Sequence, residues 1–191
     1  MTISEKKLLV DILASSLGAK RHTPSSKEMN HLSKIGYVKD GKITKLGRSR
    51  IRLVLAGGVF DIIHPGHIHT LNEAKNLGDM LIVVVATDLM AEKGKKRTPL
   101  HTKEQRQILV SSISMVDVCM IGSEKDIFET VKIVDPDIVA LGYDQTHQEK
   151  TILDGCIKRG LHTSVARLQS PMPDMSSSEI RKEYDTEIHG L

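Results

Sequence analysis

From residue 52 onward, short apolar segments alternate with longer segments in which apolar residues recur at helical spacing. The apolar segments are rich in Val, Ile and Leu and lack polar alternation, which is typical of strands buried on both faces. We expect strands at 53–56, 80–86, 116–121, 138–141 and 162–168. Helices are expected at 65–77, 102–113, 125–133 and 147–159, with a last helix beginning near 177. This alternation predicts an α/β fold with a Rossmann-like parallel sheet, in which ligands bind beyond the carboxyl ends of the strands.

The first fifty residues follow a different pattern. Apolar residues recur at helical spacing over 8–17, and Ser25 with Glu28 forms a potential capping box before a second helix. The segment 37–43 is typical of a hairpin around an Asp-Gly turn. Two helices, a basic hairpin and a Gly-Arg segment resemble a shortened winged-helix module that binds DNA. A small packing or dimerisation appendage is the alternative, because fifty residues leave little room for a third helix.

Charge separates the same two regions. Residues 1–50 contain 11 Lys and Arg against 4 Asp and Glu, a net charge of +7, whereas the remainder carries −4. We therefore expect two units, a basic winged-helix-like or appendage domain at 1–50 and an α/β domain at 51–191. The basic unit is a candidate for contact with DNA.

Composition excludes several other classes of protein. No apolar run approaches the ~18 residues of a membrane span, and the first residues lack a secretory pattern. Two isolated cysteines, Cys119 and Cys156, fit a reducing compartment, so we expect a cytoplasmic protein without membrane contact. Aromatic residues make up only 3% of the chain, and Trp is absent, which argues against an aromatic platform for stacking bases.

The strongest chemical signal lies after the first strand of the alternating region. Gly57-Gly58 breaks the strand, and Pro65 is a suitable first residue for a helix. His64 and His67 then lie three residues apart, on one side of the helix N-terminus. Free backbone N–H groups and the helix dipole attract phosphate at such a terminus. The pattern predicts a nucleotide-phosphate site; the alternative is two surface histidines by chance.

Three further segments fall at strand ends or helix starts. Ser176, Ser177 and Ser178 open the last helix, where hydroxyl side chains either cap the helix or bind phosphate. A lysine-rich loop at 93–98, with Arg106 downstream, is suited to neutralising phosphate or is merely a solvated basic loop. Finally, Asp144 follows a strand and suits a nucleotide contact or a plain turn. No cluster of residues with metal-ligand spacing is visible in the sequence.

The run Gly58-Val59-Phe60-Asp61 followed by His64-Pro65-Gly66-His67 resembles the signature of the HxGH nucleotidyltransferases, in particular their cytidylyltransferase-like group. The resemblance covers about residues 52–185. Within this group, the run from Pro136 to Gln145 is most similar to the archaeal FAD synthases, which are FMN adenylyltransferases. The resemblance implies an enzyme that joins ATP and FMN to give FAD and pyrophosphate. It also implies Mg²⁺ carried with ATP and a homodimer.

The same resemblance implies roles for individual residues. His64 and His67 would stabilise the transferring phosphate, with Arg106 and Lys93 as the other catalytic residues. In the basic loop, Lys95 and Arg97 are alternatives to Lys93. The nucleotide would be bound by further residues: Gly58, Val59, Phe60, Gly66, Asp144, Ser176, Ser177 and Arg181. Ser178 replaces the usual Thr of the family's Ser-Ser-Thr-x-Ile-Arg motif, which keeps the hydroxyl group.

Two other functions are compatible with the sequence. The first is transfer of CMP to glycerol 3-phosphate or a similar phosphorylated acceptor, although 170–174 lacks an arginine found in some cytidylyltransferases. The second is a DNA-binding regulator whose C-terminal part senses a nucleotide or flavin. Comparison of ATP with CTP across several acceptors would distinguish the possible enzymes. A gel shift with DNA, repeated at higher salt, would test the regulator.

Overall fold

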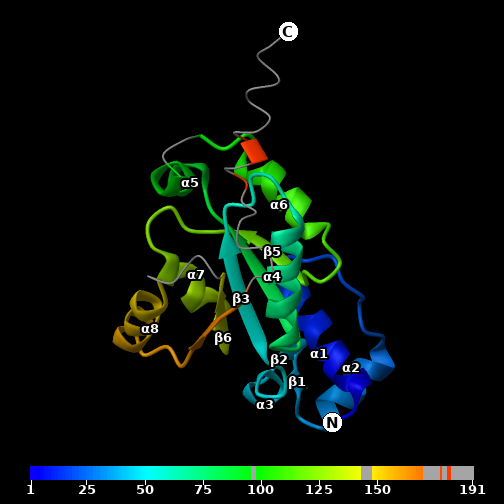
Figure 1. Cartoon of the computed structure of the whole chain (residues 1–191). Coiled ribbons are helices and arrows are strands. Elements are labelled where there is room, and N and C mark those ends of the chain that lie inside the picture. Colours follow the sequence, from blue (N-terminus) through cyan, green and yellow to red (C-terminus); the bar gives the residue numbers. More distant parts are fainter. Residues whose placement is uncertain (96–97, 143–147, 170–176, 178–179, 182–191) are drawn as a thin grey trace.

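The computed structural model describes residues 1–95, 98–142, 148–169, 177 and 180–181 of the chain. Its centre is a five-stranded parallel sheet with the strand order β5-β4-β3-β6-β7 (Figure 1). The strands are β3 (Leu53–Gly58), β4 (Met80–Val85), β5 (Val118–Ile121), β6 (Ile138–Leu141) and β7 (Ser164–Arg167). All five predicted strands are therefore present, and all neighbouring strands in the sheet pair in parallel.

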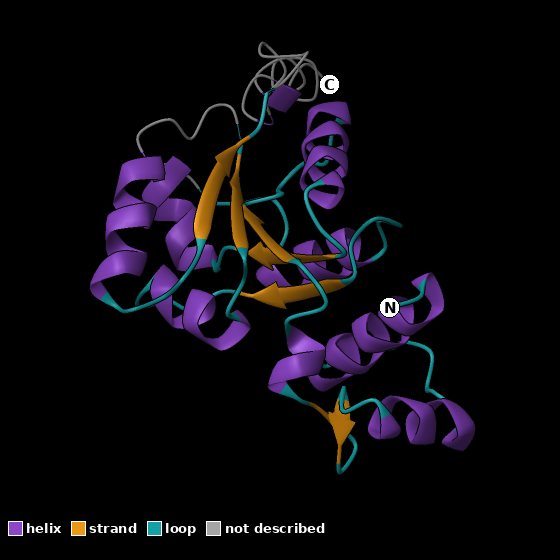
Figure 2. Cartoon of the chain, turned by 90° about the horizontal axis from the view of Figure 1, so that it is seen from below, coloured by secondary structure: helices purple, strands orange, loops and turns teal. Residues whose placement is uncertain are grey.

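Helices cover both faces of this sheet (Figure 2). They are α4 (Pro65–Asn76), α5 (Asp88–Lys95), α6 (Lys103–Ser111), α7 (Ile127–Val134) and α8 (Gln148–Lys158). Because side chains alternate along a strand, β3 contributes to two cores. Val54 packs with residues of α4 and α6 on one face, and Leu55 packs with residues of α7 and α8 on the other. The α/β fold predicted from the sequence is confirmed.

The order of the strands determines where a ligand can bind. The chain starts the sheet at β3, moves outward through β4 to β5, and then returns to place β6 on the opposite side of β3. β3 and β6 are thus the two strands from which the connections leave in opposite directions. The crevice at the carboxyl ends of two such strands is the usual ligand site of an open parallel sheet.

The N-terminal residues form two helices, a hairpin and a short third helix. These are α1 (Ile3–Ser16), α2 (Ser26–Lys34), β1 (Val38–Lys39), β2 (Lys42–Ile43) and α3 (Lys45–Arg48). The predicted capping box is present, since the side chain of Ser25 accepts from the backbone of Glu28. Leu9, Leu32 and Val38 are buried in the same core as Leu53 and Met80. The N-terminal elements therefore pack directly on the sheet.

Ion pairs also attach these elements to the amino edge of the sheet. Three aspartates each directly precede a strand and accept a backbone N–H from the start of a neighbouring strand. Asp79, Asp117 and Asp137 do so at 2.8, 2.7 and 2.7 Å, from the nitrogens of Arg52, Leu81 and Leu53 respectively. Each is also paired with a basic N-terminal residue: Lys6 with Asp79 (2.9 Å), Arg21 with Asp117 (2.7 Å) and Arg48 with Asp137 (3.0 Å). We call Asp79, Asp117 and Asp137 the aspartate edge.

Two segments differ from their predictions. Little room for a third helix was expected within the first fifty residues, but the Gly-Arg segment contains α3. The basic loop expected at 93–98 is helical up to Lys95, because α5 extends over Asp88–Lys95. The helix begins after Thr87, whose hydroxyl accepts the backbone N–H of Met90 at 3.3 Å. Within the parts of the chain that the structure describes, no helix is long and apolar enough to cross a membrane.

Candidate active site

The two histidines lie at the junction of β3 and α4. His64 has an extended backbone at the N-cap of α4, and Pro65 occupies the first turn. The centroids of the two imidazole rings are 3.9 Å apart, and the backbone N–H of His64 donates to Nδ1 of His67 at 3.4 Å. The spacing of the histidines therefore predicted their proximity correctly. Both rings lie at the N-terminus of α4, beyond the carboxyl end of the central strand β3. The dipole of α4 favours binding of an anion there.

The loop before His64 turns sharply at Phe60. This residue has φ +55°, in the left-handed region that is uncommon for a side chain other than Gly, Asn or Asp. Its ring is buried and lies 5.3 Å from the ring of His67. A Cβ on Gly58 would be only 2.9 Å from the Phe60 ring, so glycine is needed for this close approach. The turn packs Phe60 against the histidine pair.

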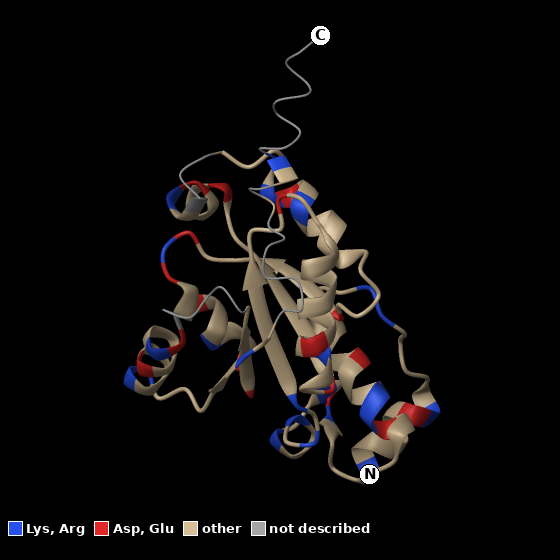
Figure 3. Ribbon diagram, in the orientation of Figure 1, with Lys and Arg blue, Asp and Glu red and all other residues tan. Residues whose placement is uncertain are grey.

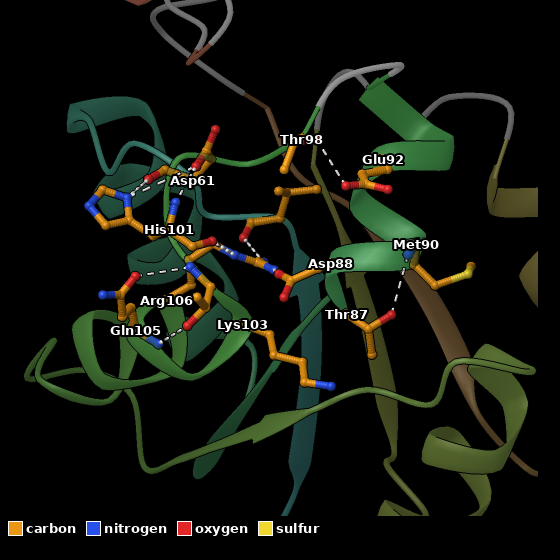
Figure 4. A network of polar contacts seen from close by, with 12 residues as sticks. Asp61, Thr87, Asp88, Met90, Glu92, Thr98, His101, Lys103, Gln105 and Arg106 are labelled. Atoms are coloured by element: carbon orange, nitrogen blue, oxygen red, sulfur yellow. Dashed lines mark hydrogen bonds and ion pairs between the residues drawn. The ribbon is translucent and has the colours of Figure 1, made fainter.

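Arg106 holds one side of this turn. Its side chain is completely buried although it extends from α6, and its guanidinium contacts three groups (Figure 4). Nη1 donates to the carbonyl of Val59 at 2.6 Å, Nε donates to the carbonyl of His101 at 3.0 Å, and Nη2 pairs with Asp88 at 2.6 Å. Arg106 therefore links the histidine loop to the segment that follows β4. Its predicted contact with phosphate stays a prediction.

Asp61 holds the other side of the turn. Its carboxylate is buried and accepts the backbone N–H groups of Leu100 at 2.6 Å and His101 at 3.4 Å. Nδ1 of His101 lies 3.0 Å from the carbonyl oxygen of Asp61 (Figure 4). Segment 98–106 thus contacts the loop on both sides of Phe60. We call Asp61, Asp88, His101 and Arg106 the loop clamp.

Two described residues of the predicted Ser-Ser-Ser-x-Ile-Arg motif, Ser177 and Arg181, also contact this region. The hydroxyl of Ser177 donates to the carbonyl of Ile62 at 3.0 Å, and Nη1 of Arg181 donates to the carbonyl of Thr98 at 3.4 Å. The structure therefore brings Ser177 of the predicted phosphate motif to the histidine loop, and Arg181 to the neighbouring segment 98–106. Ser176 and Asp144, also predicted as nucleotide-binding residues, lie outside the described residues.

Two other predicted residues occupy different positions. Gly66 is buried in the first turn of α4, where its carbonyl accepts the hydroxyl of Thr70 at 2.9 Å. Lys93 lies on α5 and is exposed to solvent. His101 and Asp88, which hold the turn in place, were not predicted as site residues. For Asp88, the sequence shows only that it follows the end of a predicted strand. That position does not identify Arg106 as its partner.

The described side chains offer no ready-made metal site. In the described ranges, no group of three or more His, Cys, Asp or Glu residues is arranged to hold a metal ion. Nor does Cys119 provide a reactive thiolate, because burial raises the pKa of its thiol to about 12. The arrangement can bind and stabilise an anion, but it contains no activated cysteine nucleophile at Cys119.

Comparison with known proteins identifies the family. The family model described as cytidylyltransferase-like matches residues 55–183, which include the histidine loop, the loop clamp and the start of the last helix. The chain belongs to the cytidylyltransferase-like family. This cytidylyltransferase-like enzyme is a nucleotidyltransferase, and the family model leaves its first 54 residues unmatched.

Within the cytidylyltransferase-like family, the chain is similar in sequence to FAD synthases. It is 48% identical to the FAD synthase of Picrophilus torridus over 130 residues, which are 68% of this chain and 93% of that protein. The FAD synthase of Methanosarcina barkeri is 43% identical over 132 residues, 68% of this chain and 94% of the relative.

Solved structures agree with the fold. The crystal structure of the lipopolysaccharide core biosynthesis protein from Thermoplasma volcanium is 41% identical, with a TM-score of 0.60 over 63% of this chain and 98% of that one. A protein of unknown function from Archaeoglobus fulgidus, at 18% identity, shares the fold with a TM-score of 0.53 over 64% of this chain and 93% of its own.

Proposed function

We propose that the enzyme is an FMN adenylyltransferase, which converts ATP and FMN to FAD and pyrophosphate. The observation that carries this proposal is the histidine pair at the N-terminus of α4, in a chain 41–48% identical to FAD synthases. The histidine geometry supports nucleotidyl transfer, and the relatives support FMN as the acceptor.

The reaction is a direct displacement at phosphorus. A phosphate oxygen of FMN attacks the α-phosphorus of ATP and forms a new P–O bond, while the bond to the α,β-bridging oxygen breaks. The electron pair of that bond leaves with pyrophosphate. Because negative charge accumulates on the equatorial oxygens, catalysis depends mainly on positioning and on hydrogen-bond donors. His64 and His67 are the proposed donors, supported by the backbone N–H groups of α4.

Ser177 and Arg181 are proposed to bind the β- and γ-phosphates of ATP, which leave as pyrophosphate. Ser177 is held against the histidine loop through Ile62, so the start of the last helix is near the phosphates that α4 would bind. The backbone of Val59 and Phe60 would pass beside the triphosphate. Lys93, exposed on α5, and Asp144 are proposed for phosphate neutralisation and nucleotide contact respectively.

A divalent cation, proposed to be Mg²⁺, would enter with the triphosphate. Mg²⁺ is commonly bound through phosphate oxygens and water with only one or two protein carboxylates. The cation would neutralise phosphate charge.

The test is a turnover matrix with the full chain. Purified protein is incubated with ATP or CTP, a divalent cation, and either FMN or glycerol 3-phosphate. Nucleotide products and pyrophosphate are then separated and quantified. We expect FAD and pyrophosphate in equal amounts from ATP and FMN. Turnover of CTP with glycerol 3-phosphate, without FAD formation, would contradict the choice of acceptor and nucleotide but retain the class of reaction.

Three features of the molecule beyond the catalytic site are also proposed. The enzyme would act in the cytoplasm as a homodimer, and residues 1–50, with their net charge of +7, would contact DNA. Sedimentation of the purified chain would measure the oligomeric state. A basic winged-helix-like or appendage unit at 1–50, packed on the domain at 51–191, is the corresponding proposal for the domain organisation.

A further inference from the structure

The hairpin β1–β2 and the adjoining helix α3 carry several Lys and Arg residues in a short stretch of the ribbon (Figure 3). Four of these residues are exposed: Lys39, Lys42, Lys45 and Arg50. Asp40 is the only acidic residue within 34–50. We call these four residues the basic hairpin face.

The hairpin aligns two of these charges directly. Lys39 is paired with Lys42 across the hairpin, while Val38 is paired with Ile43. Val38 is buried and Ile43 packs against the core, so the adjacent lysine pair remains exposed. Like charges directly opposite each other destabilise a strand pair. Packing alone therefore gives no reason for this arrangement, whereas a polyanion bound across both lysines would offset the repulsion.

Helix α3 is fixed against the same hairpin. A Cβ on Gly47 would be 2.2 Å from the carbonyl oxygen of Tyr37, so α3 and the hairpin are in close contact. The guanidinium of Arg50 lies over the ring of Tyr37, 5.8 Å from its centroid. Lys45 begins α3. The four charges are consequently carried by one rigid piece of structure.

These charges are not used to attach the N-terminal elements to the sheet. The aspartate edge is occupied by Lys6, Arg21 and Arg48. Among the described residues, no ion pair with an acidic side chain involves the basic hairpin face. The basic residues of 1–50 thus divide into a structural set and an exposed set.

We propose that the basic hairpin face binds the phosphate backbone of duplex DNA without reading its sequence. The proposal rests on the contact with DNA proposed for residues 1–50 and identifies the side chains that make it. Each hairpin strand is only two residues long, which suits contact with backbone phosphates better than insertion into a groove. The face lies near the amino edge of the sheet, opposite the histidine loop (Figure 1), so DNA and ATP could bind together.

Two other anionic partners fit the surface less well. Single-stranded nucleic acid is usually bound by stacking of bases on aromatic rings, but Tyr37 is the only aromatic residue here and Arg50 lies over it. An anionic membrane is usually bound by an amphipathic helix with an apolar face. Helix α3 has only four residues and cannot supply such a face.

The test measures binding of the full chain to a fluorescently labelled duplex as the salt concentration is raised. Four phosphate contacts predict a slope of log K against log salt of about −3.6. The double variant Lys39→Gln/Lys42→Gln should halve this slope and raise Kd at least about tenfold at low salt. Removal of the like-charge pair does not threaten folding, which thermal melting of the variant verifies.

The matched control is Lys150→Gln/Lys158→Gln, which removes two exposed charges from α8. It should bind the duplex like the unmodified chain. Equal weakening by both double variants would overturn the proposal, because binding would then reflect net charge alone. Binding to anionic vesicles or single strands in preference to the duplex would also overturn it.

Adenylyl transfer from ATP to FMN is measured on the same preparations. We expect both double variants to form FAD at the rate of the unmodified chain. Absence of FAD from all preparations, with DNA binding as predicted, would refute the proposed catalytic function and leave the DNA surface intact. The two failures are therefore distinguishable.

Discussion

At the scale of single residues, the left-handed turn at Phe60 connects the loop clamp to the proposed chemistry. Arg106 and Asp61 fix the backbone on either side of that turn, and the ring of Phe60 lies against His67. Positions of hydrogen-bond donors matter strongly for nucleotidyl transfer, since a displacement of about 1 Å can cost about a hundredfold in rate. Residues without substrate contact can therefore affect catalysis through the loop.

The histidine pair gives the most direct prediction. His64→Ala and His67→Ala should each lower kcat for FAD formation by about a hundredfold or more, because each removes a donor to the charge that develops on phosphorus. Thermal melting should change little. His69→Ala, on the same helix, is the control and should retain activity. A near-normal kcat in either of the first two variants would contradict the role of that histidine.

Arg106 tests the clamp. Arg106→Lys keeps the charge but cannot reproduce three directed contacts from one planar group, so we expect kcat to fall about 10- to 100-fold. If Arg106 positions the loop without contacting substrate, KM for ATP should change much less than kcat. Steady-state kinetics below the melting temperature of the variant provides this comparison.

Arg159→Lys is the matched control for that experiment. Arg159 also forms an ion pair, with Asp126 at 2.8 Å, but it is partly exposed. Its replacement should leave kcat within about twofold, as expected for an exposed pair. A large rise in KM for ATP in Arg106→Lys would instead favour the predicted direct contact between Arg106 and phosphate.

At the scale of elements, the strands were the most predictable part of the chain. Buried runs such as 80–86 and 138–141 are too apolar and too short for anything but central strands, and each was found within about two residues. Helix α5 was missed because Lys and Gly dominate 93–96 and outweigh the single capping signal at Thr87. The hairpin was predicted by its Asp-Gly turn, which φ values of +50° and +76° confirm.

The aspartate edge leads to a prediction about pH. Burial raises the pKa of Asp79, but hydrogen bonds from Lys6 and from the backbone of Arg52, with the charges of Lys6 and Lys75, outweigh it and lower the pKa below 3.8. A carboxylate whose pKa is lower in the folded than in the unfolded chain stabilises the fold at pH values above its ordinary pKa of 3.8. This stabilisation is lost as the pH falls through the pKa of the folded state. Asp79→Asn should therefore reduce the free energy of unfolding near neutral pH.

Urea denaturation at about pH 7 and about pH 3 measures this effect. The difference between the unmodified chain and Asp79→Asn should shrink at the lower pH, where the carboxylate becomes protonated. Asp154→Asn, on α8, supplies a comparison outside the aspartate edge. A difference that stays constant with pH would show that the charge of Asp79 is not what stabilises the edge.

At the scale of the whole molecule, the site is assembled from three distant segments. The loop 59–64, the segment 98–106 and Ser177 meet at the carboxyl end of β3. The histidine loop and the Ser-Ser-Ser-x-Ile-Arg segment could be predicted as parts of the site because each has a local sequence motif. It could not predict that Asp88 pairs with Arg106, because that contact depends on the packing of α6 against the sheet. Local sequence patterns indicate which segments contribute to the site, whereas tertiary packing determines which side chains contact each other.

The N-terminal elements show the same dependence at larger scale. Their charge was visible in the sequence, but the division between ion-paired and exposed basic residues follows only from their docking on the sheet. In sequence, an aspartate stands before three of the strands, yet nothing there names Lys6, Arg21 or Arg48 as partners.

Several contacts that assemble the site end on main-chain carbonyls. Arg106, Ser177 and Arg181 donate to the carbonyls of residues 59, 62 and 98 respectively. Every amino acid supplies that acceptor, so substitutions at the three receiving positions leave the bonds intact. As related sequences diverge, we expect the three donor residues to be retained while the residues that supply the carbonyls are substituted freely. Correlated substitutions would therefore not reveal these contacts. The framework of the site can thus persist while the side chains facing the substrate change, which gives the fold room to acquire new acceptors.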